Sequence, residues 1–358
     1  MVSISLCMIV KNEQETLARC LETVKDLVDE IVIVDTGSTD RTKEIASRYT
    51  KKIYDFNWID DFSAARNFSF AKATKDYIMW LDADDVLLPA DREKLSRLKR
   101  QLDPAADAVT MEYDYAFDDQ GNVTFKVKRT RLVKREKQFQ WRGVVHEDLI
   151  VSGRVIETDI VVTHKQMHRF TDRNLKIFEK QLRDGKELTP QDLLNYAMEL
   201  YHNQRFEQAK EYFLRFMEVE NIDSDYKVLA CNHLAECYNQ LGDREREWEY
   251  LLKSFQYDIP RPEFCCRIAL RMMDQKKDRQ AVFWCKLALD LPVPERQQLT
   301  TFESCRTWLP HIYLSICYYR LGDYELSYQH TKTALTYRPN DEDLQHNLYV
   351  LEELIRQK

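Results

Sequence analysis

The sequence predicts an α/β domain followed by an all-α domain, and three observations support this division. The first part alternates strand-like and helical stretches, as in "SISLCMIV", "EQETLARCLETVKDL" and "EIVIVDTG". Beyond about Arg173 the strand-like runs stop, and similar helical segments recur. A chain of 358 residues with 44% hydrophobic residues is long enough for two domains, each with a core. We therefore assign residues 1–170 to the α/β domain and residues 171–358 to the helical domain.

The α/β domain is expected to contain a mostly parallel sheet with helices on both faces. After the stretches quoted above come a helix "TDRTKEIASRY", a strand "KKIYDF", a helix "SAARNFSFAKAT" and a strand "DYIMWLDA". Alternation of β and α elements at this length is typical of such sheets. From Asp107 to Thr163 the strand-like runs are longer, and "DDQGN" is a hairpin turn signal. These runs are predicted to extend the sheet with antiparallel strands.

The helical domain shows an internal repeat. The segments "YHNQRFEQAKEYF", "YNQLGDREREWEY", "MDQKKDRQAVFWC" and "YRLGDYELSYQHT" align with Gln204, Gly242, Lys276 and Gly322 equivalent, roughly 38, 34 and 46 residues apart. The longest spacing contains "DLPVPERQQLTTFES", a loop rich in proline and polar residues. Tetratricopeptide repeats have a period of about 34 residues. The pattern predicts about four such repeats, with an irregular helical bundle as the alternative.

Composition excludes several classes of protein. The net charge of −7 argues against a general nucleic-acid binder. The sequence has no run of about 18 apolar residues that would span a membrane, and its first residues do not resemble a signal peptide. The nine cysteines are scattered without metal-type spacing, which suggests reduced thiols. Together these features predict a cytoplasmic protein.

Polar residues gather where predicted strands end. They are Lys11, Asn12 and Glu13 after the first strand, Asp35 after the second, and Asp82, Asp84 and Asp85 after "YIMWL". Ligands of parallel sheets bind at the carboxyl ends of strands. Adjacent carboxylates repel one another unless a cation joins them, and a divalent cation commonly bridges carboxylates to a nucleoside diphosphate. Capping of following helices would not require three acids.

Several of these strand-end residues, together with Arg66 on the predicted helix before the Asp82 strand, suit the same ligand. Asp82 and Asp84, two residues apart, can both turn toward one ion, directly or through water or a ribose. The carboxylate of Asp35 can accept hydrogen bonds from a base or ribose, and the guanidinium of Arg66 suits phosphate oxygens. The sequence therefore predicts a site for a metal ion and a nucleoside diphosphate.

The motifs "SLCMIVKNE", "IVIVDTGSTDRT", "FSAARNFSFAKATKDYIMWLDADD" and "WRGVVHE", in this order over about residues 3–165, resemble family-2 glycosyltransferases with the GT-A fold. The resemblance extends to a subgroup with a tetratricopeptide tail. That subgroup includes bacterial peptide and protein glycosyltransferases, such as glycocin S-glycosyltransferases and flagellin-modifying enzymes. It implies a nucleotide-sugar donor, usually UDP-linked, and Mn²⁺ or Mg²⁺ bound through an Asp-x-Asp motif.

The resemblance also implies roles for individual residues in donor binding. Val10 and Glu13 would line the base-binding cleft, Asp35 would contact uracil or ribose, and Arg66 would lie on the diphosphate side. Asp82 would face the ribose or metal-bound water, and Asp84 would be the direct metal ligand. The family's common "VDDGS" reads "VDTGS" here, so Thr36 replaces an acid and the base contact depends on Asp35.

The remaining candidates lie in the β-rich region. Inverting transfer needs a base, and the resemblance places it at Glu147 in "VHE", with Asp148 as the alternative. His146 could hold the base or the sugar, and Trp141 could stack on the sugar, although both could equally be structural. His164, or nearby His168, could complete the metal site, because neutral imidazole is an acceptable ligand.

The sequence thus predicts an inverting, metal-dependent glycosyltransferase that moves a sugar, glucose or N-acetylglucosamine, to a peptide or protein side chain. The acceptor atom is a serine or threonine oxygen or a cysteine sulfur. Helical repeats form concave surfaces suited to a polypeptide acceptor or to a second copy of the chain. The alternatives are an enzyme of cell-surface polysaccharide or glycolipid synthesis that uses the repeats for oligomerisation, and a non-catalytic scaffold.

Overall fold

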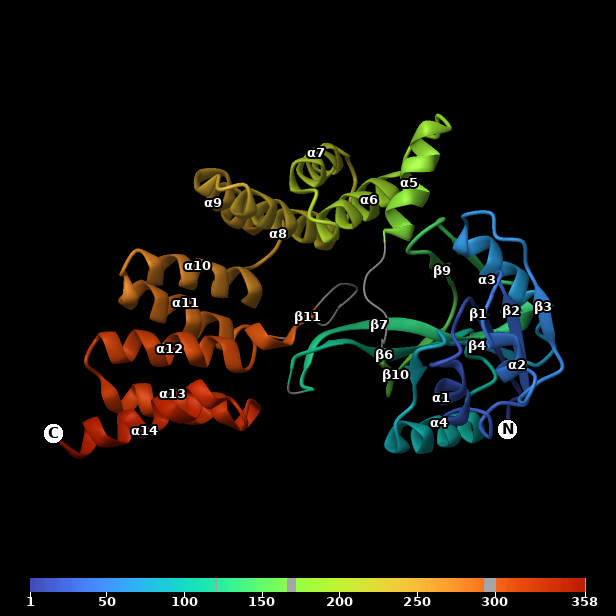
Figure 1. Ribbon diagram of the computed structural model, residues 1–358, viewed down its shortest axis with the longest axis horizontal. Helices are drawn as coiled ribbons and strands as arrows, with labels where there is room; N and C mark the ends of the chain where they lie inside the picture. Colours follow the sequence, from blue (N-terminus) through green and yellow to red (C-terminus); the bar gives the residue numbers. More distant parts are fainter. Residues whose placement is uncertain (120, 166–171, 293–300, 358) are drawn as a thin grey trace. The chain divides into compact units, whose positions relative to one another are not determined.

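A computed structural model describes residues 1–119, 121–165, 172–292 and 301–357 (Figure 1). The chain forms two compact units. An α/β unit comprises Met1–Asp114 and Lys128–Gln204, and a helical unit comprises Tyr115–Val127 and Arg205–Lys358. The α/β unit therefore retains two helices beyond residue 170, and the helical unit includes the outer end of a β-hairpin. The domain boundary at residue 170 stays a prediction.

The α/β unit is built on one large mixed sheet. Its strands run in the order β3-β2-β1-β4-β7-β6-β10-β5. Their bounds are β1 Ile4–Val10, β2 Glu30–Asp35, β3 Ile53–Asp55, β4 Tyr77–Trp80, β5 Asp85–Val86, β6 Ala108–Phe117, β7 Val123–Lys134 and β10 Val155–His164. Strands β3, β2, β1 and β4 are parallel neighbours, so their carboxyl ends meet at one edge.

Burial explains why the first strands are almost continuously apolar. Every residue of β2 and nearly every residue of β1 is buried, as expected for a parallel strand covered on both faces. The helices are α1 Leu17–Glu22, α2 Thr42–Ala46, α3 Phe62–Phe70 and α4 Pro89–Gln101. Helix α3 packs on β1 and β2, and α1 and α4 lie over the opposite face (Figure 1). The predicted alternating architecture is confirmed.

The later strands differ in part from the predicted antiparallel extension. Strands β6 and β7 form the expected hairpin, and β7 pairs antiparallel with β4. However, β10 runs parallel to β6, and it pairs antiparallel only with the short β5. The strands β8 (Gln140–Arg142) and β9 (Asp148–Ile150) form a separate two-stranded sheet. Gly143, with φ of 97°, turns the chain between them without the strain of a Cβ atom.

Two helices follow the sheet within the α/β unit, and a helical stack forms the second unit. Helices α5 (Arg173–Arg183) and α6 (Pro190–His202) belong to the first unit. The second contains α7 Phe206–Met217, α8 Ser224–Gln240, α9 Arg244–Lys253, α10 Pro262–Asp274, α11 Asp278–Asp290, α12 Trp308–Arg320, α13 Tyr324–Tyr337 and α14 Glu342–Arg356. Consecutive helices pack pairwise, as α8 with α9, α10 with α11 and α12 with α13.

The backbone supports the predicted repeat alignment. Gln204, Gly242, Lys276 and Gly322 all lie in the turn between two helices and have positive φ angles of 59°, 80°, 57° and 80°. A left-handed residue just after the last helical turn is a common way to end a helix. The four aligned positions are therefore equivalent in conformation. The proline-rich loop predicted in the longest spacing lies largely outside the described residues.

The outer end of the β6–β7 hairpin packs within the helical unit. The side-chain amide of Asn122 donates to the carbonyl of Tyr337 at 2.9 Å. Arg338 forms an ion pair with Asp118 at 3.2 Å, and its guanidinium lies 4.6 Å from the ring centre of Trp308. The two-residue strand β11 (Thr301–Phe302) pairs with β7 in the same unit. This hairpin tip is thus part of the helical unit's structure.

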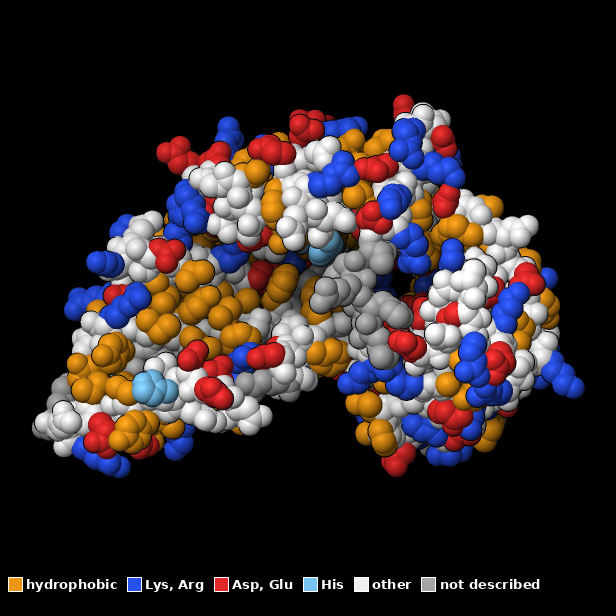
Figure 2. All heavy atoms as spheres, in the orientation of Figure 1, with side chains coloured by type: hydrophobic (Ala, Val, Ile, Leu, Met, Phe, Trp, Pro, Cys, Tyr) orange, Lys and Arg blue, Asp and Glu red, His pale blue; other side chains and the backbone are white. Residues whose placement is uncertain are grey.

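Three further properties of the described residues bear on function. No helix among the described residues is both long enough and apolar enough to cross a membrane. On the face drawn in Figure 2, hydrophobic side chains gather over α10 to α12. The large exposed hydrophobic residues of these helices include Leu270, Phe283 and Tyr319, the second of which is 62% exposed. The nine cysteines are buried with free thiols.

Candidate active site

The first part of the site lies where β1 and β2 end. Val10 and Asp35 are register partners on these strands, and both are buried. The Asp35 Oδ2 accepts hydrogen bonds from the backbone amides of Gly37 and Ser38 at 3.1 and 3.0 Å. Its Oδ1 is buried and, among the described residues, has no hydrogen-bond partner. Because buried polar atoms are nearly always satisfied, this oxygen is well placed to accept a bond from a ligand.

Hydrogen bonds connect the loops that follow β1 and β2. The Thr36 hydroxyl donates to the carbonyl of Val10 at 3.1 Å, so the residue that replaces the family's acid supports the strand end. The Glu13 amide donates to the Thr42 hydroxyl at 2.7 Å, and the Glu13 carboxylate accepts from Thr16 at 2.5 Å. These bonds fix Glu13 in the loop after β1.

The three acids after β4 have different surroundings. Asp82 Oδ1 lies 2.8 Å from Arg66 Nη2, and its amide donates to Asp85 Oδ2 at 2.9 Å. Asp85 is fully buried and lies 3.0 Å from Arg131 Nη1, which is also fully buried. Burial alone would raise the pKa of Asp82, but the charges of Arg66 and Arg131 outweigh it and the pKa is lowered. Two of the three acids are therefore paired with arginines.

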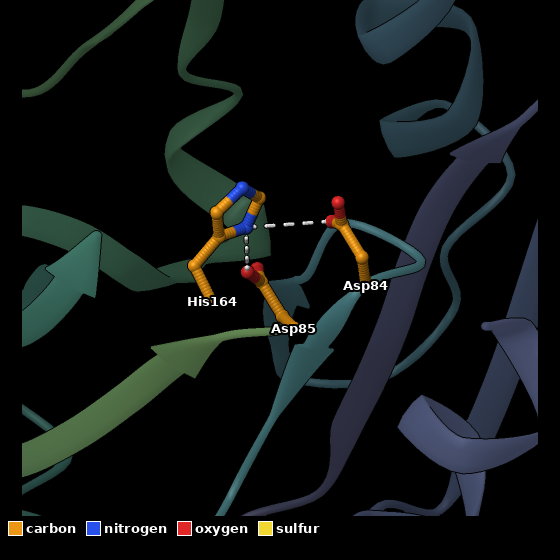
Figure 3. Close-up of side chains that lie close together, drawn as sticks. All are labelled: Asp84, Asp85 and His164. Atoms are coloured by element: carbon orange, nitrogen blue, oxygen red, sulfur yellow. Dashed lines mark ion pairs between the residues drawn. The ribbon is translucent and has the colours of Figure 1, made fainter. Parts of the chain in front are cut away.

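Among the described residues, Asp84 forms no ion pair with an arginine, and it faces His164 at the end of β10. Figure 3 shows Asp84, Asp85 and His164 together, with His164 Nδ1 3.5 Å from Asp84 Oδ1 and 3.5 Å from Asp85 Oδ1. Burial raises the pKa of Asp84 to about 6; the charge of His164 opposes this, and the charges of Asp82, Asp85 and Glu13 add to it. The carboxylate is therefore costly to ionise without a nearby cation.

This cluster fits a divalent metal ion. Asp84, Asp85 and His164 each offer a ligand atom, and these atoms lie within 4.8 Å of one another. Carboxylate oxygens suit Mg²⁺ and Mn²⁺, and the imidazole nitrogen favours Mn²⁺ of the two. The residues predicted to hold the metal, Asp84 and His164, are thus brought together. His168, the alternative ligand, lies outside the described residues.

A buried guanidinium joins the metal cluster to the predicted base. Arg66, on α3, lies 2.5 Å from Glu147 Oε1 as well as 2.8 Å from Asp82. Its carbon Cζ lies 4.8 Å from the ring centres of both Trp80 and Trp141. Trp141 is itself 4% exposed, so its position is that of a core residue that supports Arg66. Arg66 therefore holds two carboxylates in place, a role that its predicted diphosphate contact did not include.

The loop that carries Glu147 is fixed from two sides. The Phe62 amide, at the start of α3, donates to the carbonyl of Val144 at 2.9 Å. His146, with φ of 54°, places Nε2 2.6 Å from Glu199 Oε1, and Asn174 donates to the same oxygen at 3.0 Å. Helices α5 and α6 thus support the loop, and His146 bonds to a helix residue.

Arg173 is a cation beside this loop that the sequence prediction missed. Its guanidinium lies 4.7 Å from the ring centre of Phe62, and it forms no hydrogen bond or ion pair among the described residues. Burial of the guanidinium lowers its pKa, and the charges of Glu13, Glu147, Glu199 and Asp82 oppose this effect. The residue as a whole is exposed, so part of its side chain reaches the surface although the guanidinium is partly buried.

The structure thus brings the predicted residues to one edge of the sheet, and their individual roles stay predictions. Arg131 and Arg173 were not predicted as site residues, and Asp85 was predicted only as a member of the acidic cluster. The three adjacent acids were visible in the sequence, but their different partners come from strands far along the chain. The predicted alternative base, Asp148, begins β9 and lies 3.4 Å from Arg129.

Comparison with known proteins agrees with this geometry. Residues 5–164 match the family model described as glycosyl transferase family 2, and residues 163–262 match the SusR N-terminal TPR domain. Residues 5–164 thus match a family 2 glycosyltransferase model in the part of the chain that forms the mixed sheet, and the match to a tetratricopeptide-type model covers helices that follow it. The fold class and the family resemblance predicted from the sequence are confirmed.

Two curated relatives match over part of their length. A TPR repeat-containing protein of Synechococcus elongatus is 43% identical over 148 residues, which are 41% of this chain and 35% of the relative. The SPbeta prophage-derived glycosyltransferase SunS of Bacillus subtilis is 27% identical over 230 residues, or 59% of this chain and 52% of SunS. The chain thus spans about half or less of the length of these relatives.

A solved structure matches more weakly. The mannosyltransferase PcManGT from Pyrobaculum calidifontis, in complex with GDP-Man and Mn²⁺, has a TM-score of 0.37 and 16% sequence identity. The match covers 71% of this chain and 87% of that chain.

Proposed function

We propose that this protein is an inverting, metal-dependent glycosyltransferase that moves a sugar from a nucleotide-sugar to a peptide or protein side chain. The observation that carries the proposal is the Arg66 guanidinium, which binds Asp82 of the acidic cluster and Glu147 at once. The shared contact of Glu147 and Asp82 with Arg66 supports the assignment of Glu147 as a base close to a metal ion and a diphosphate. Such an arrangement serves displacement of a nucleoside diphosphate from an anomeric carbon.

The donor would be held by residues at the strand ends. Asp35 Oδ1, which lacks a partner among the described residues, would accept a hydrogen bond from the base or ribose, and Val10 and Glu13 would line the same corner. Asp84 and His164 would hold a divalent cation, with Asp82 facing ribose or metal-bound water. The bound cation supplies charge neutralisation for the leaving diphosphate. UDP-glucose and UDP-N-acetylglucosamine are the proposed donors.

Glu147 would take the proton of the attacking hydroxyl or thiol. Its side chain is 9% exposed and is oriented by Arg66, so it needs little reorganisation when the acceptor arrives. Acid–base catalysis by a positioned carboxylate contributes about 10²–10⁴-fold in rate.

A polypeptide acceptor is supported by the helical region. The hydrophobic side chains gathered over α10 to α12 (Figure 2) provide a surface on which a peptide could bind. Stacked repeats commonly bind extended polypeptides in this way. The same surface could hold a second copy of the chain, which a measurement of molar mass in solution would detect.

The first experiment is calorimetric titration of UDP, with GDP as the control, in the presence and absence of Mn²⁺. We expect tight binding of UDP only with the metal, followed by sugar transfer to peptides but not to lipid acceptors. The Asp84→Ala variant should lose metal-dependent nucleotide binding, and Glu147→Gln should keep binding but lose about 10²-fold or more in transfer rate. Absence of nucleotide binding under all conditions would refute the proposal, and transfer to lipid alone would refute the acceptor.

A further inference from the structure

Asp85 is unlike Asp84 in having both carboxylate oxygens engaged. Oδ2 accepts from the Asp82 amide at 2.9 Å and faces Arg131 Nη1 at 3.0 Å. Oδ1 accepts from the Tyr113 hydroxyl at 2.8 Å. The Asp84 side chain is 21% exposed, and its close charged neighbour is His164. The carboxylate of Asp84 is therefore more accessible to a metal ion than that of Asp85.

The Tyr113 hydroxyl lies between Asp85 and His164. It is 2.8 Å from Asp85 Oδ1 and 2.8 Å from His164 Nδ1. A carboxylate only accepts hydrogen bonds, so the hydroxyl proton must point to Asp85, and the hydroxyl oxygen then accepts from Nδ1–H. In a neutral imidazole this leaves the lone pair on Nε2.

Arg131 fixes the tyrosine ring that makes this connection. It is fully buried, and its Cζ lies 3.9 Å from the ring centre of Trp80 and 4.4 Å from that of Tyr113. The guanidinium is thus held between two aromatic rings while it faces Asp85. Such stacking restricts the ring orientation of Tyr113, because a rotated ring would lose contact with the cation.

We propose that Asp85 and Tyr113 are positioning residues that fix His164 with its proton on Nδ1, so that Nε2 is the nitrogen that binds the metal. This inference rests on the proposed metal-dependent function. A partner on the second nitrogen of a metal-binding histidine sets its tautomer and orientation, and its loss typically costs 10–100-fold in metal affinity. Imidazole discriminates between Mn²⁺ and Mg²⁺ more than carboxylates do, so these residues also set the preference for Mn²⁺.

The test compares Mn²⁺ and Mg²⁺ binding to the full-length wild type and to Tyr113→Phe, by calorimetry and by electron paramagnetic resonance of Mn²⁺, with and without UDP. We expect Tyr113→Phe to weaken Mn²⁺ binding about 10–100-fold and Mg²⁺ binding much less. The matched control is Tyr77→Phe, which removes another buried hydroxyl of the same sheet, bonded to the Ala106 carbonyl at 2.8 Å. That control should bind both ions as the wild type does.

A double-mutant cycle separates positioning from general loss of structure. If Tyr113 acts through His164, then Tyr113→Phe should have no further effect on Mn²⁺ affinity in a His164→Ala background. Equal weakening of both ions, unchanged Mn²⁺ affinity, or additive effects in the cycle would overturn the inference. Metal-dependent UDP binding by the wild type alongside any of these results would leave the proposed function standing.

A measurement on the wild type tests the same inference without a substitution at Asp85 or Tyr113. Nitrogen NMR of ¹⁵N-histidine-labelled protein, with the His164 signals assigned from a His164→Gln sample, reports which ring nitrogen carries the proton. We expect protonated Nδ1 and unprotonated Nε2 in the neutral ring. A neutral ring with its proton on Nε2 would overturn the inference even if Tyr113→Phe did not fold.

Discussion

Replacement of Arg66 by alanine would remove the cation that holds two carboxylates together. The Arg66 and Glu147 side chains are each 9% exposed, and Asp82 is 35% exposed. Breaking a buried pair leaves an uncompensated charge, which we take as about 3 kcal/mol for Glu147. The partly exposed Asp82 pair adds about 1 kcal/mol. We therefore expect the free energy of unfolding of the α/β unit to fall by about 4 kcal/mol.

The loss should also depend on pH. Burial would raise the pKa of Asp82, but Arg66 and Arg131 lower it overall, so the pair stabilises the fold above the ordinary carboxyl pKa. That stabilisation is lost as pH falls and the carboxylate becomes protonated. The difference between wild type and Arg66→Ala should therefore shrink as the pH falls below ~4, the ordinary carboxyl value, toward the lowered pKa of Asp82.

Native-state hydrogen exchange of peptides from α3 would measure this loss. A decrease of about 4 kcal/mol corresponds to exchange roughly a thousandfold faster for amides that exchange by unfolding of the unit. The matched control is Arg100→Ala, which removes an exposed arginine of α4 that donates to the Ser96 hydroxyl at 3.1 Å. That change should cost less than about 0.5 kcal/mol. An effect of Arg66→Ala below about 1 kcal/mol would refute the idea that Arg66 holds two otherwise uncompensated acids.

Three further predictions follow from other residues. Burial would raise the pKa of Glu30, but hydrogen bonds from Lys52, Ser5 and Thr74 lower it from 4.5 to about 2. The Glu30→Gln variant should therefore lose about 3 kcal/mol in the free energy of unfolding at pH 7. Denaturant titrations should show that this difference from the wild type vanishes near pH ~2. Arg173→Ala should weaken binding of UDP, but not uridine, about tenfold by calorimetry, because only a phosphate ligand needs the cation; equal binding of UDP would contradict this. Arg338→Ala removes the ion pairs of Arg338 with Asp118 and Asp119 in the hairpin tip. Hydrogen exchange in residues 115–127 should therefore become roughly thirtyfold faster, the equivalent of about 2 kcal/mol. Unchanged exchange there would contradict the packing described.

The parts of the fold that could be predicted from sequence are those set by local patterns. Buried parallel strands read as apolar runs, so β1, β2 and β4 were recognisable, and their carboxyl ends located the site. The turn positions Gly242 and Gly322 marked the repeats because glycine readily adopts positive φ. Gln204 and Lys276 occupy the same conformation without that signal, and they were found only through the alignment.

Long-range partners could not be predicted in the same way. The contact between Arg66 and Glu147 joins residues 81 positions apart, and that between His146 and Glu199 joins residues 53 positions apart. Spacing in the sequence carries no information on such pairs, because they depend on how the sheet places each element. The predicted domain boundary at residue 170 and the predicted diphosphate contact of Arg66 stay predictions.

The three acids after β4 show how the fold assigns different roles to chemically similar residues. Asp82 is paired with Arg66, and Asp85 with Arg131, so each of these charges is balanced by a neighbouring guanidinium. In the part of the chain that the structure describes, Asp84 pairs with His164 alone, and its pKa is raised to about 6 by burial and by the surrounding acids, against the opposing charge of His164. Among the described residues, Asp84 is therefore the acid of the three that has no guanidinium beside it to supply a balancing positive charge. A divalent cation at this position would supply that charge, which is why Asp84, rather than its neighbours, is the acid whose loss should remove metal binding while leaving both arginine pairs intact.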